Sequence, residues 1–78
     1  MELINKKISV IGMGRTGVPT ANFLAARGAE VLLTDQQEQV SLENQLKGLS
    51  SKVRATFGTS LPSPDADMIV LSPGLDIN

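Results

Sequence analysis

The sequence predicts an α/β protein built on an open parallel sheet, and three observations lead to this fold class. Four short segments can each form one strand: three are largely apolar, at residues 7–11, 30–35 and 68–71, and one, at residues 53–57, alternates in part between apolar and polar residues. The first run is nearly continuous, as expected for a strand buried on both faces of a parallel sheet. It leads into a glycine-rich turn and then a helical pattern, the order of a strand–helix–strand unit. Within this run Ser9 is a polar exception, and we expect its hydroxyl to bond a neighbouring backbone group.

The first helix is expected over residues 16–27, where alanines and other apolar residues recur at helical spacing. Thr16 is a candidate N-cap, which would place Pro19 in the first turn, where proline is tolerated. Arg27 would lie in the last turn, because the helix dipole favours a cation there. Gly28 would then end the helix in a left-handed conformation.

The second half of the chain predicts one short helix and a connection without a helix. Ser41 is a candidate N-cap for a short amphipathic helix that follows a polar loop at residues 36–40. Residues 59–64 include two prolines and two serines, so we expect them to form a loop.

These elements predict the strand order 3-2-1-4. Right-handed crossovers place the second and third strands on one side of the first strand and the fourth strand on the other. Ligands bind in such sheets at the carboxyl ends of the strands, where the order reverses. The outer edge of the fourth strand would be apolar and uncovered. We therefore expect the chain to self-associate, or to be a longer chain truncated after the fourth strand.

Residues 12–17 have the spacing Gly-x-Gly-x-x-Gly between a strand and a helix. Here Gly12 permits a tight turn, Gly14 lets a phosphate approach the backbone, and Gly17 lets the helix pack closely on the strand. The first helical turn adds unpaired N–H groups and the positive end of the helix dipole. Thr16 has a second candidate role here, contact with a phosphate oxygen. We expect a diphosphate at this turn; the alternative is a plain tight turn without a ligand.

Asp35 ends the second strand roughly 20 residues after this turn, the distance expected for an acidic residue that contacts a nucleotide. From the residues alone, the leading interpretation is a dinucleotide site with Asp35 on a ribose hydroxyl. This would be the NAD(P)-binding domain of an oxidoreductase, or a potassium-transport regulatory domain. A structural or interaction domain without a ligand remains a further alternative.

The composition narrows the classes of function. The 78 residues allow one domain at most, covering residues 1–78, and the net charge of −1 does not favour nucleic acid as a partner. The chain has no Cys and no His, so it lacks a thiolate nucleophile, the usual general base and the commonest metal ligands. We read Asp65 and Asp67 as solvated loop carboxylates and expect no metal. With no signal peptide and no apolar run of about 20 residues, we expect a cytoplasmic protein without membrane contact.

Residues 11–17, 25–35 and 66–74 resemble the Rossmann-like amino-terminal domain of the Mur ligases, most of all the MurD type. The resemblance covers nearly the whole chain. Its most discriminating part is the Ser-Pro-Gly ending at residues 72–74, because dehydrogenases and potassium-transport domains share the glycine motif and the Asp but do not usually carry this ending.

The resemblance implies a ligase of peptidoglycan precursor synthesis whose substrate is UDP-N-acetylmuramoyl-L-alanine. ATP would phosphorylate the terminal carboxylate of this substrate, and D-glutamate would attack the acyl phosphate. The first domain would hold the UDP part, with Arg15 and Thr16 on the diphosphate, and with Asp35 and Gln36 on the uracil. The implied UDP-substrate-binding residues are Gly14, Arg15, Thr16, Gly17, Asp35, Gln36, Ser72, Pro73 and Gly74.

This chain also departs from the family pattern. The family more often has a Thr-Arg or similar pair after the Asp, where Gln36 and Gln37 stand here, so no contact is assigned to Gln37. The family's phosphate-binding loop lies in a central domain, and no Gly-x-x-Gly-Lys-Thr segment occurs in these residues. ATP and Mg²⁺ are therefore implied for a full-length enzyme. This chain is expected to bind neither, to carry no catalytic residue, and to be inactive without the remaining domains.

Overall fold

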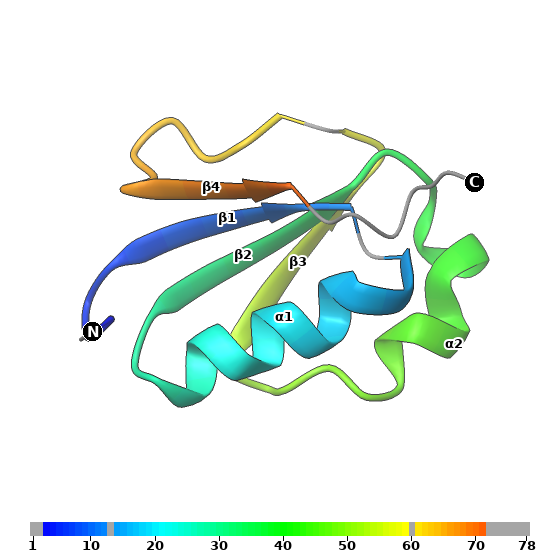
Figure 1. The fold of residues 1–78 in the computed structure, drawn as a ribbon. Helices are drawn as coiled ribbons and strands as arrows, with labels where there is room; N and C mark the ends of the chain where they lie inside the picture. Colours follow the sequence, from blue (N-terminus) through cyan, green and yellow to red (C-terminus); the bar gives the residue numbers. More distant parts are fainter. Residues whose placement is uncertain (1–2, 13, 60, 72–78) are drawn as a thin grey trace.

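In the computed structural model, the chain forms a four-stranded parallel sheet with the order β3-β2-β1-β4 (Figure 1). The structure describes residues 3–12, 14–59 and 61–71. The strands are β1 (Lys7–Ile11), β2 (Glu30–Asp35), β3 (Val53–Phe57) and β4 (Met68–Leu71). The expected α/β class, the four strands and their order are confirmed. Among the described residues, no strand pairs with the outer edge of β4, and self-association through this edge stays a prediction.

The first helix, α1 (Gly14–Ala26), begins two residues earlier than expected. Gly12 has a φ of 94° and turns the chain so sharply that the helix starts almost at once. Thr16 therefore lies in the first turn and is not the N-cap. Pro19 lies inside the helix beyond the first turn, where it cannot donate a hydrogen bond to the carbonyl four residues earlier.

The end of α1 also differs in part from the expectation. Arg27 lies beyond the last helical residue, and its guanidinium stacks 4.6 Å from the centroid of the Phe23 ring. Arg27 therefore makes a cation–π contact with Phe23 and does not lie in the last turn of α1, where it was expected. Gly28 has a φ of 95°, which confirms the left-handed stop.

The second helical segment consists of a 3-10 turn, η1 (Gln39–Leu42), followed by α2 (Glu43–Leu46). The expectation that Ser41 is the N-cap is wrong, because the helical turn already begins at Gln39 after the extended residue Glu38. Leu42 is buried in the core and anchors this turn there. Asn22 of α1 holds the exit from α2, since its side-chain amide bonds the carbonyl of Gly48 and the N–H of Ser50.

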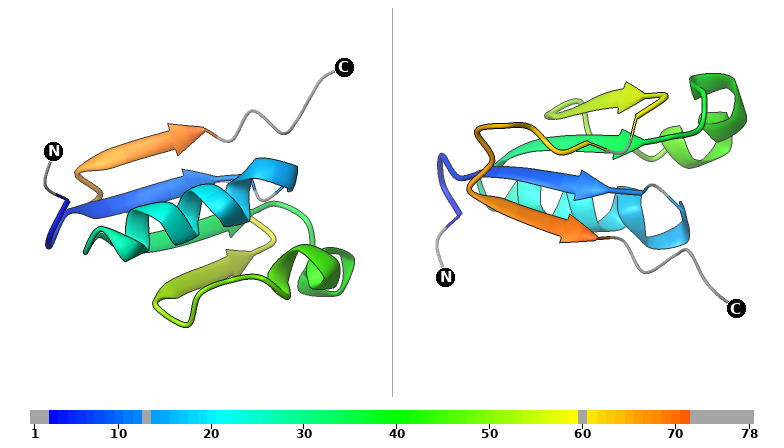
Figure 2. Two further views of the ribbon diagram at one scale, coloured as in Figure 1. Left: turned by 60° about the horizontal axis from the view of Figure 1, so that its bottom comes forward. Right: turned by 90° about the horizontal axis from the view of Figure 1, so that it is seen from above.

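The two faces of the sheet are covered differently, as the views in Figure 2 show. The helix α1 packs on one face, where Val10 and Leu33 stand in register. The core lies between this face and α1. It consists of Leu3, Ile8, Val10, Val18, Ala21, Ala25, Ala29, Val31, Leu33, Leu42 and Val53.

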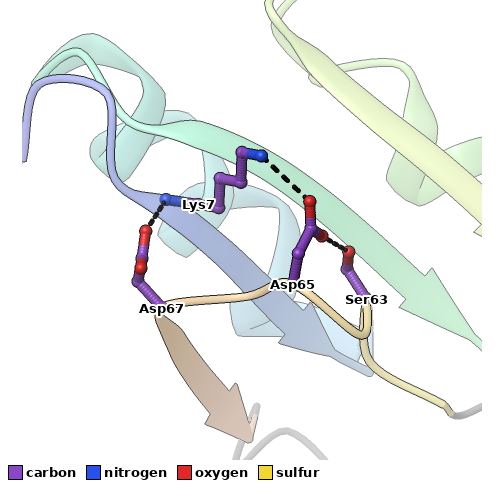
Figure 3. A network of polar contacts seen from close by, with 4 residues as sticks. All are labelled: Lys7, Ser63, Asp65 and Asp67. Carbon is purple, nitrogen blue, oxygen red and sulfur yellow. Dashed lines mark hydrogen bonds and ion pairs between the residues drawn. The ribbon is translucent and has the colours of Figure 1, made fainter.

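The opposite face is crossed by the β3–β4 connection, residues 58–67, which we call the strap. Its described residues contain no helix, as the prolines and serines predict (Figure 2, right). The N–H of Ser63 donates to the buried Ser9 Oγ at 2.9 Å, which confirms that Ser9 bonds a backbone group. Lys7 Nζ forms an ion pair with Asp65 at 2.9 Å, and the Ser63 hydroxyl donates to the other oxygen of the same carboxylate (Figure 3).

The Asp65 carboxylate should add a small acid-dependent contribution to the stability of the fold, because its ion pair is exposed. The Ser63 hydrogen bond and then the Lys7 ammonium lower the pKa of Asp65 from 3.8 to about 2. A lowered folded-state pKa gives stability that is complete above the unfolded-state pKa and is lost as the pH falls through the folded-state pKa. The urea midpoint of the wild type should therefore exceed that of Asp65→Asn above pH 4, and the difference should vanish as the pH approaches 2. A difference that persists unchanged to pH 2 would contradict this assignment.

Candidate functional site

The turn after β1 is joined directly to the end of β2. Ile11 and Thr34 are register partners, so Gly12 and Asp35 are the next residues on neighbouring strands. The N–H of Gly12 donates to the carbonyl oxygen of Thr34 at 2.7 Å. This bond fixes the glycine turn and Asp35 at the same carboxyl edge of the sheet.

Gly17 brings α1 into contact with the backbone of this turn. A Cβ on Gly17 would lie 2.2 Å from the carbonyl oxygen of Gly12, a distance that no side chain tolerates. This confirms the close packing expected of the third glycine. Since the obstacle is backbone, the helix could accept a larger residue only by moving away from the sheet.

The start of α1 faces the carboxyl edge in a way that suits an anion. Gly14 and Arg15 are the first two helical residues and Thr16 is the third, with Thr16 exposed. The first turn of a helix presents N–H groups without intrahelical partners and the positive end of the dipole. A phosphate or carboxylate can be held there by backbone alone.

The carboxylate of Asp35 is buried and orders the loop after β2. Its Oδ1 accepts the N–H of Gln37 at 2.8 Å, an Asx turn. The backbone completes the loop, because Gly58 donates to the carbonyl of Gln37, and Thr59 donates to that of Asp35. Gln36 is exposed beside this loop. From the sequence, Asp35 was assigned only to a ligand contact. An Asp at the start of a polar loop could also have indicated an Asx turn.

Thr34 is a polar residue of this edge that the sequence did not single out for a role. It is fully buried, and its hydroxyl lies 3.0 Å from that of Thr56 on β3. This cross-strand pair satisfies the Thr34 hydroxyl within the sheet and joins β2 to β3 next to Asp35.

Three expected site residues, Ser72, Pro73 and Gly74, lie outside the described residues. The described part of β4 ends at Leu71, whose register partner is Ile11, the residue before Gly12. β4 therefore ends at the same edge as the glycine turn.

A small cavity lies elsewhere, under the strap. Its volume is about 80 Å³, and it opens near the amino ends of β1 and β2. Its lining residues are Lys7, Ile8, Ser9, Glu30, Leu32, Arg54, Ser63, Asp65 and Ala66. The binding groups that the structure describes at the carboxyl edge are the backbone at the start of α1 and the loop after β2.

Within residues 3–12, 14–59 and 61–71, no three His, Cys, Asp or Glu side chains gather as a metal site. None of the helices there combines the length and the apolar character that crossing a bilayer requires.

Comparison with known families decides what kind of domain carries this edge. A family described as the Mur ligase MurD-like, N-terminal domain, matches residues 6–78. The chain belongs to this family. The resemblance noted in the sequence is thereby confirmed, and MurD-like relatives confirm it independently.

These relatives are named UDP-N-acetylmuramoylalanine--D-glutamate ligase. The protein of Geotalea uraniireducens is 42% identical over 81 residues and that of Geobacter sp. strain M21 is 43% identical over 81 residues, each covering 100% of this chain. The protein of Bdellovibrio bacteriovorus is 36% identical over 80 residues and covers 99% of it. The chain spans about 18% of the length of the first two relatives, so further domains are implied. No solved structure gives a significant match.

The contact between Gly17 and Gly12 predicts that a side chain added at residue 17 will destabilise the fold. Gly17→Ala should lower the free energy of unfolding by about 2 kcal/mol, because overpacking against backbone exceeds the helix-propensity gain of about 1 kcal/mol. Gly48→Ala is the matched control, since a Cβ there has nothing within 4 Å, and its effect should stay within about 0.5 kcal/mol. Urea denaturation measures both; equal midpoints for the two variants would refute the close approach.

Proposed function

We propose that this chain binds the UDP part of UDP-N-acetylmuramoyl-L-alanine. It would do so as the first domain of a cytoplasmic ATP-dependent ligase that adds D-glutamate in peptidoglycan precursor synthesis. The relatives' names support the reaction class, and membership in the MurD-like family supports the position of the domain in the longer chain.

The observation that carries the proposal is the shared edge of the glycine turn and Asp35. The Gly12–Thr34 hydrogen bond holds the start of α1 beside the loop after β2. A nucleoside diphosphate needs an anion site and a polar base site that are separated by the length of a ribose. The first turn of α1 supplies the former, and Asp35 with the exposed Gln36 supplies the latter.

Each group has a task that its chemistry allows. The amides of residues 14–17 would hold the diphosphate, with Arg15 adding charge and Thr16 a hydroxyl donor. The Asp35 carboxylate accepts hydrogen bonds, and the Gln36 amide both donates and accepts, which matches the edge of uracil. Ser72, Pro73 and Gly74 would line the same pocket.

This chain would anchor the substrate far from the reacting carboxylate. ATP with Mg²⁺, held by other domains, would supply the phosphoryl group that activates the carboxylate for attack by the amine of D-glutamate. Binding of the remote uridine end orients the substrate for that step without chemistry in this domain.

A titration of the labelled chain tests the ligand. UDP-N-acetylmuramoyl-L-alanine should shift the amides of Gly14, Gly17 and Asp35 in NMR spectra, and NAD should not. Asp35→Ala should weaken binding about tenfold or more, a loss typical of a charged hydrogen-bonding group. Asp35→Asn separates the charge of this residue from its role in the loop. Its amide oxygen can still accept the N–H of Gln37, although the negative charge is gone. Tight NAD binding, or no shift with any uridine ligand, would rule the proposal out.

The division of labour between domains gives a second expectation. The 78-residue chain should release no phosphate from ATP in the presence of UDP-N-acetylmuramoyl-L-alanine and D-glutamate, because its sequence has no Gly-x-x-Gly-Lys-Thr loop. A coupled phosphate-release assay measures this. Substrate-dependent release above the buffer blank would show that the chain holds an ATP site of another kind.

A further inference from the structure

The side-chain pattern of β4 does not by itself select how the strand aligns with β1. The strand reads Met-Ile-Val-Leu and is apolar at every position. Met68, Ile69 and Leu71 remain 42%, 52% and 71% exposed, so neither face of the strand is fully buried. Register is strongly specified where one buried face demands apolar residues, and weakly specified where both faces are alike. Other contacts must therefore set the register of β4.

Asp67 makes such contacts one position before the pairing begins. Its Oδ2 accepts the N–H of Lys7 at 2.8 Å (Figure 3), and its own N–H donates to the carbonyl of Lys7 at 2.6 Å. Both backbone groups of one β1 residue are thus bonded by one residue of the strap. A slip by a single position would break both bonds, and the next pair, Ile8 with Met68, would be lost.

Ser9 provides a second tie, farther along β1. It is fully buried and is the register partner of Ile69, yet its Oγ accepts the N–H of Ser63 from the strap. The strap cannot move along β1 without leaving this acceptor. The hydroxyl thus explains a polar residue in the centre of the sheet.

The Lys7–Asp65 ion pair differs from these ties. Its side chains are 48% and 61% exposed, and it joins two side-chain groups rather than backbone atoms. Exposed pairs of this kind contribute little to stability and do not define an alignment. Asp65 therefore offers a matched control on the same strap.

We propose that Asp67 and Ser9 form a register clamp, a pair of positioning residues that sets where the carboxyl end of β4 lies beside the glycine turn. Leu71 stands opposite Ile11, the residue before the glycine turn. A slip of one residue would shift Leu71 by about 3.3 Å relative to this turn and would reverse the faces on which the side chains of β4 lie. The expected change in ligand binding rests on the proposed function, whereas the expected change in the pairing of β4 does not.

The experiment compares Asp67→Ala, Asp67→Asn, Ser9→Ala and Asp65→Ala with the wild-type chain. Amide hydrogen exchange of Met68–Leu71, referenced to the amides of β2, reports the pairing of β4. Titration with UDP-N-acetylmuramoyl-L-alanine reports the pocket. If Asp67→Ala fails to fold, Ser9→Ala gives the same comparison, because it removes one hydroxyl and leaves the volume of the core nearly unchanged.

Asp67→Ala and Ser9→Ala should accelerate exchange in β4 but not in β2. Each should raise the apparent Kd about two- to tenfold, because the binding-competent register becomes less populated. Asp67→Asn should retain both properties, since its amide oxygen can accept from Lys7. Asp65→Ala should match the wild type in both.

The possible failures are distinct. Exchange in β4 that is unchanged in Asp67→Ala and Ser9→Ala, or equally fast in Asp65→Ala, overturns the clamp. Faster exchange with an unchanged Kd overturns its positioning role. A wild-type chain that binds no uridine ligand overturns the proposed function, and the exchange data still decide the clamp.

Discussion

The arrangement of the whole molecule depends on the close approach of α1 to the turn that follows β1. Without a side chain at Gly17, the helix lies against the carbonyl of Gly12, and the positive φ of Gly12 makes that approach possible. The same turn is bonded to β2 through Thr34. One short segment thus sets the distance between helix and sheet, the start of the helix, and the rim on which a ligand would rest.

The two faces of the sheet are secured by different forces. Under α1, aliphatic side chains in matching register exclude water, and burial supplies the stabilisation. On the strap side, the Ser9 hydroxyl oxygen accepts a hydrogen bond and the Lys7 N–H donates one, and these bonds hold a segment whose described residues include no helix. Directional bonds fix position more sharply than apolar contact, so the side of the sheet with fewer buried groups is nevertheless well defined.

Much of the fold could be read from the sequence because it depends on local pattern and chain topology. The strands, their order and the tasks of Gly12, Gly17 and Gly28 follow from apolar runs, handedness and positive φ. The N-caps were wrong at Thr16 and Ser41. Residue type suggested those starts, whereas the backbone turn at Gly12 and the burial of Leu42 determined them.

The site was predicted less completely than the fold. The neighbourhood of the glycine turn and Asp35 followed from topology. The Asx turn of Asp35 and the Thr34–Thr56 pair did not, because they depend on which atoms face each other across a loop and between strands. The contacts of the strap join residues more than 50 positions apart, and no local pattern encodes them.

The strand order has a consequence for how the chain acquires its structure during synthesis. β1, at the centre, gains its neighbour β2 early, but Ile8 must wait for Met68, 60 residues later, before its other side is closed. Contacts that distant in sequence form slowly, because the chain must first lose the entropy of a long loop. A nascent chain on the ribosome would therefore present a half-finished central strand until almost all of these residues had emerged.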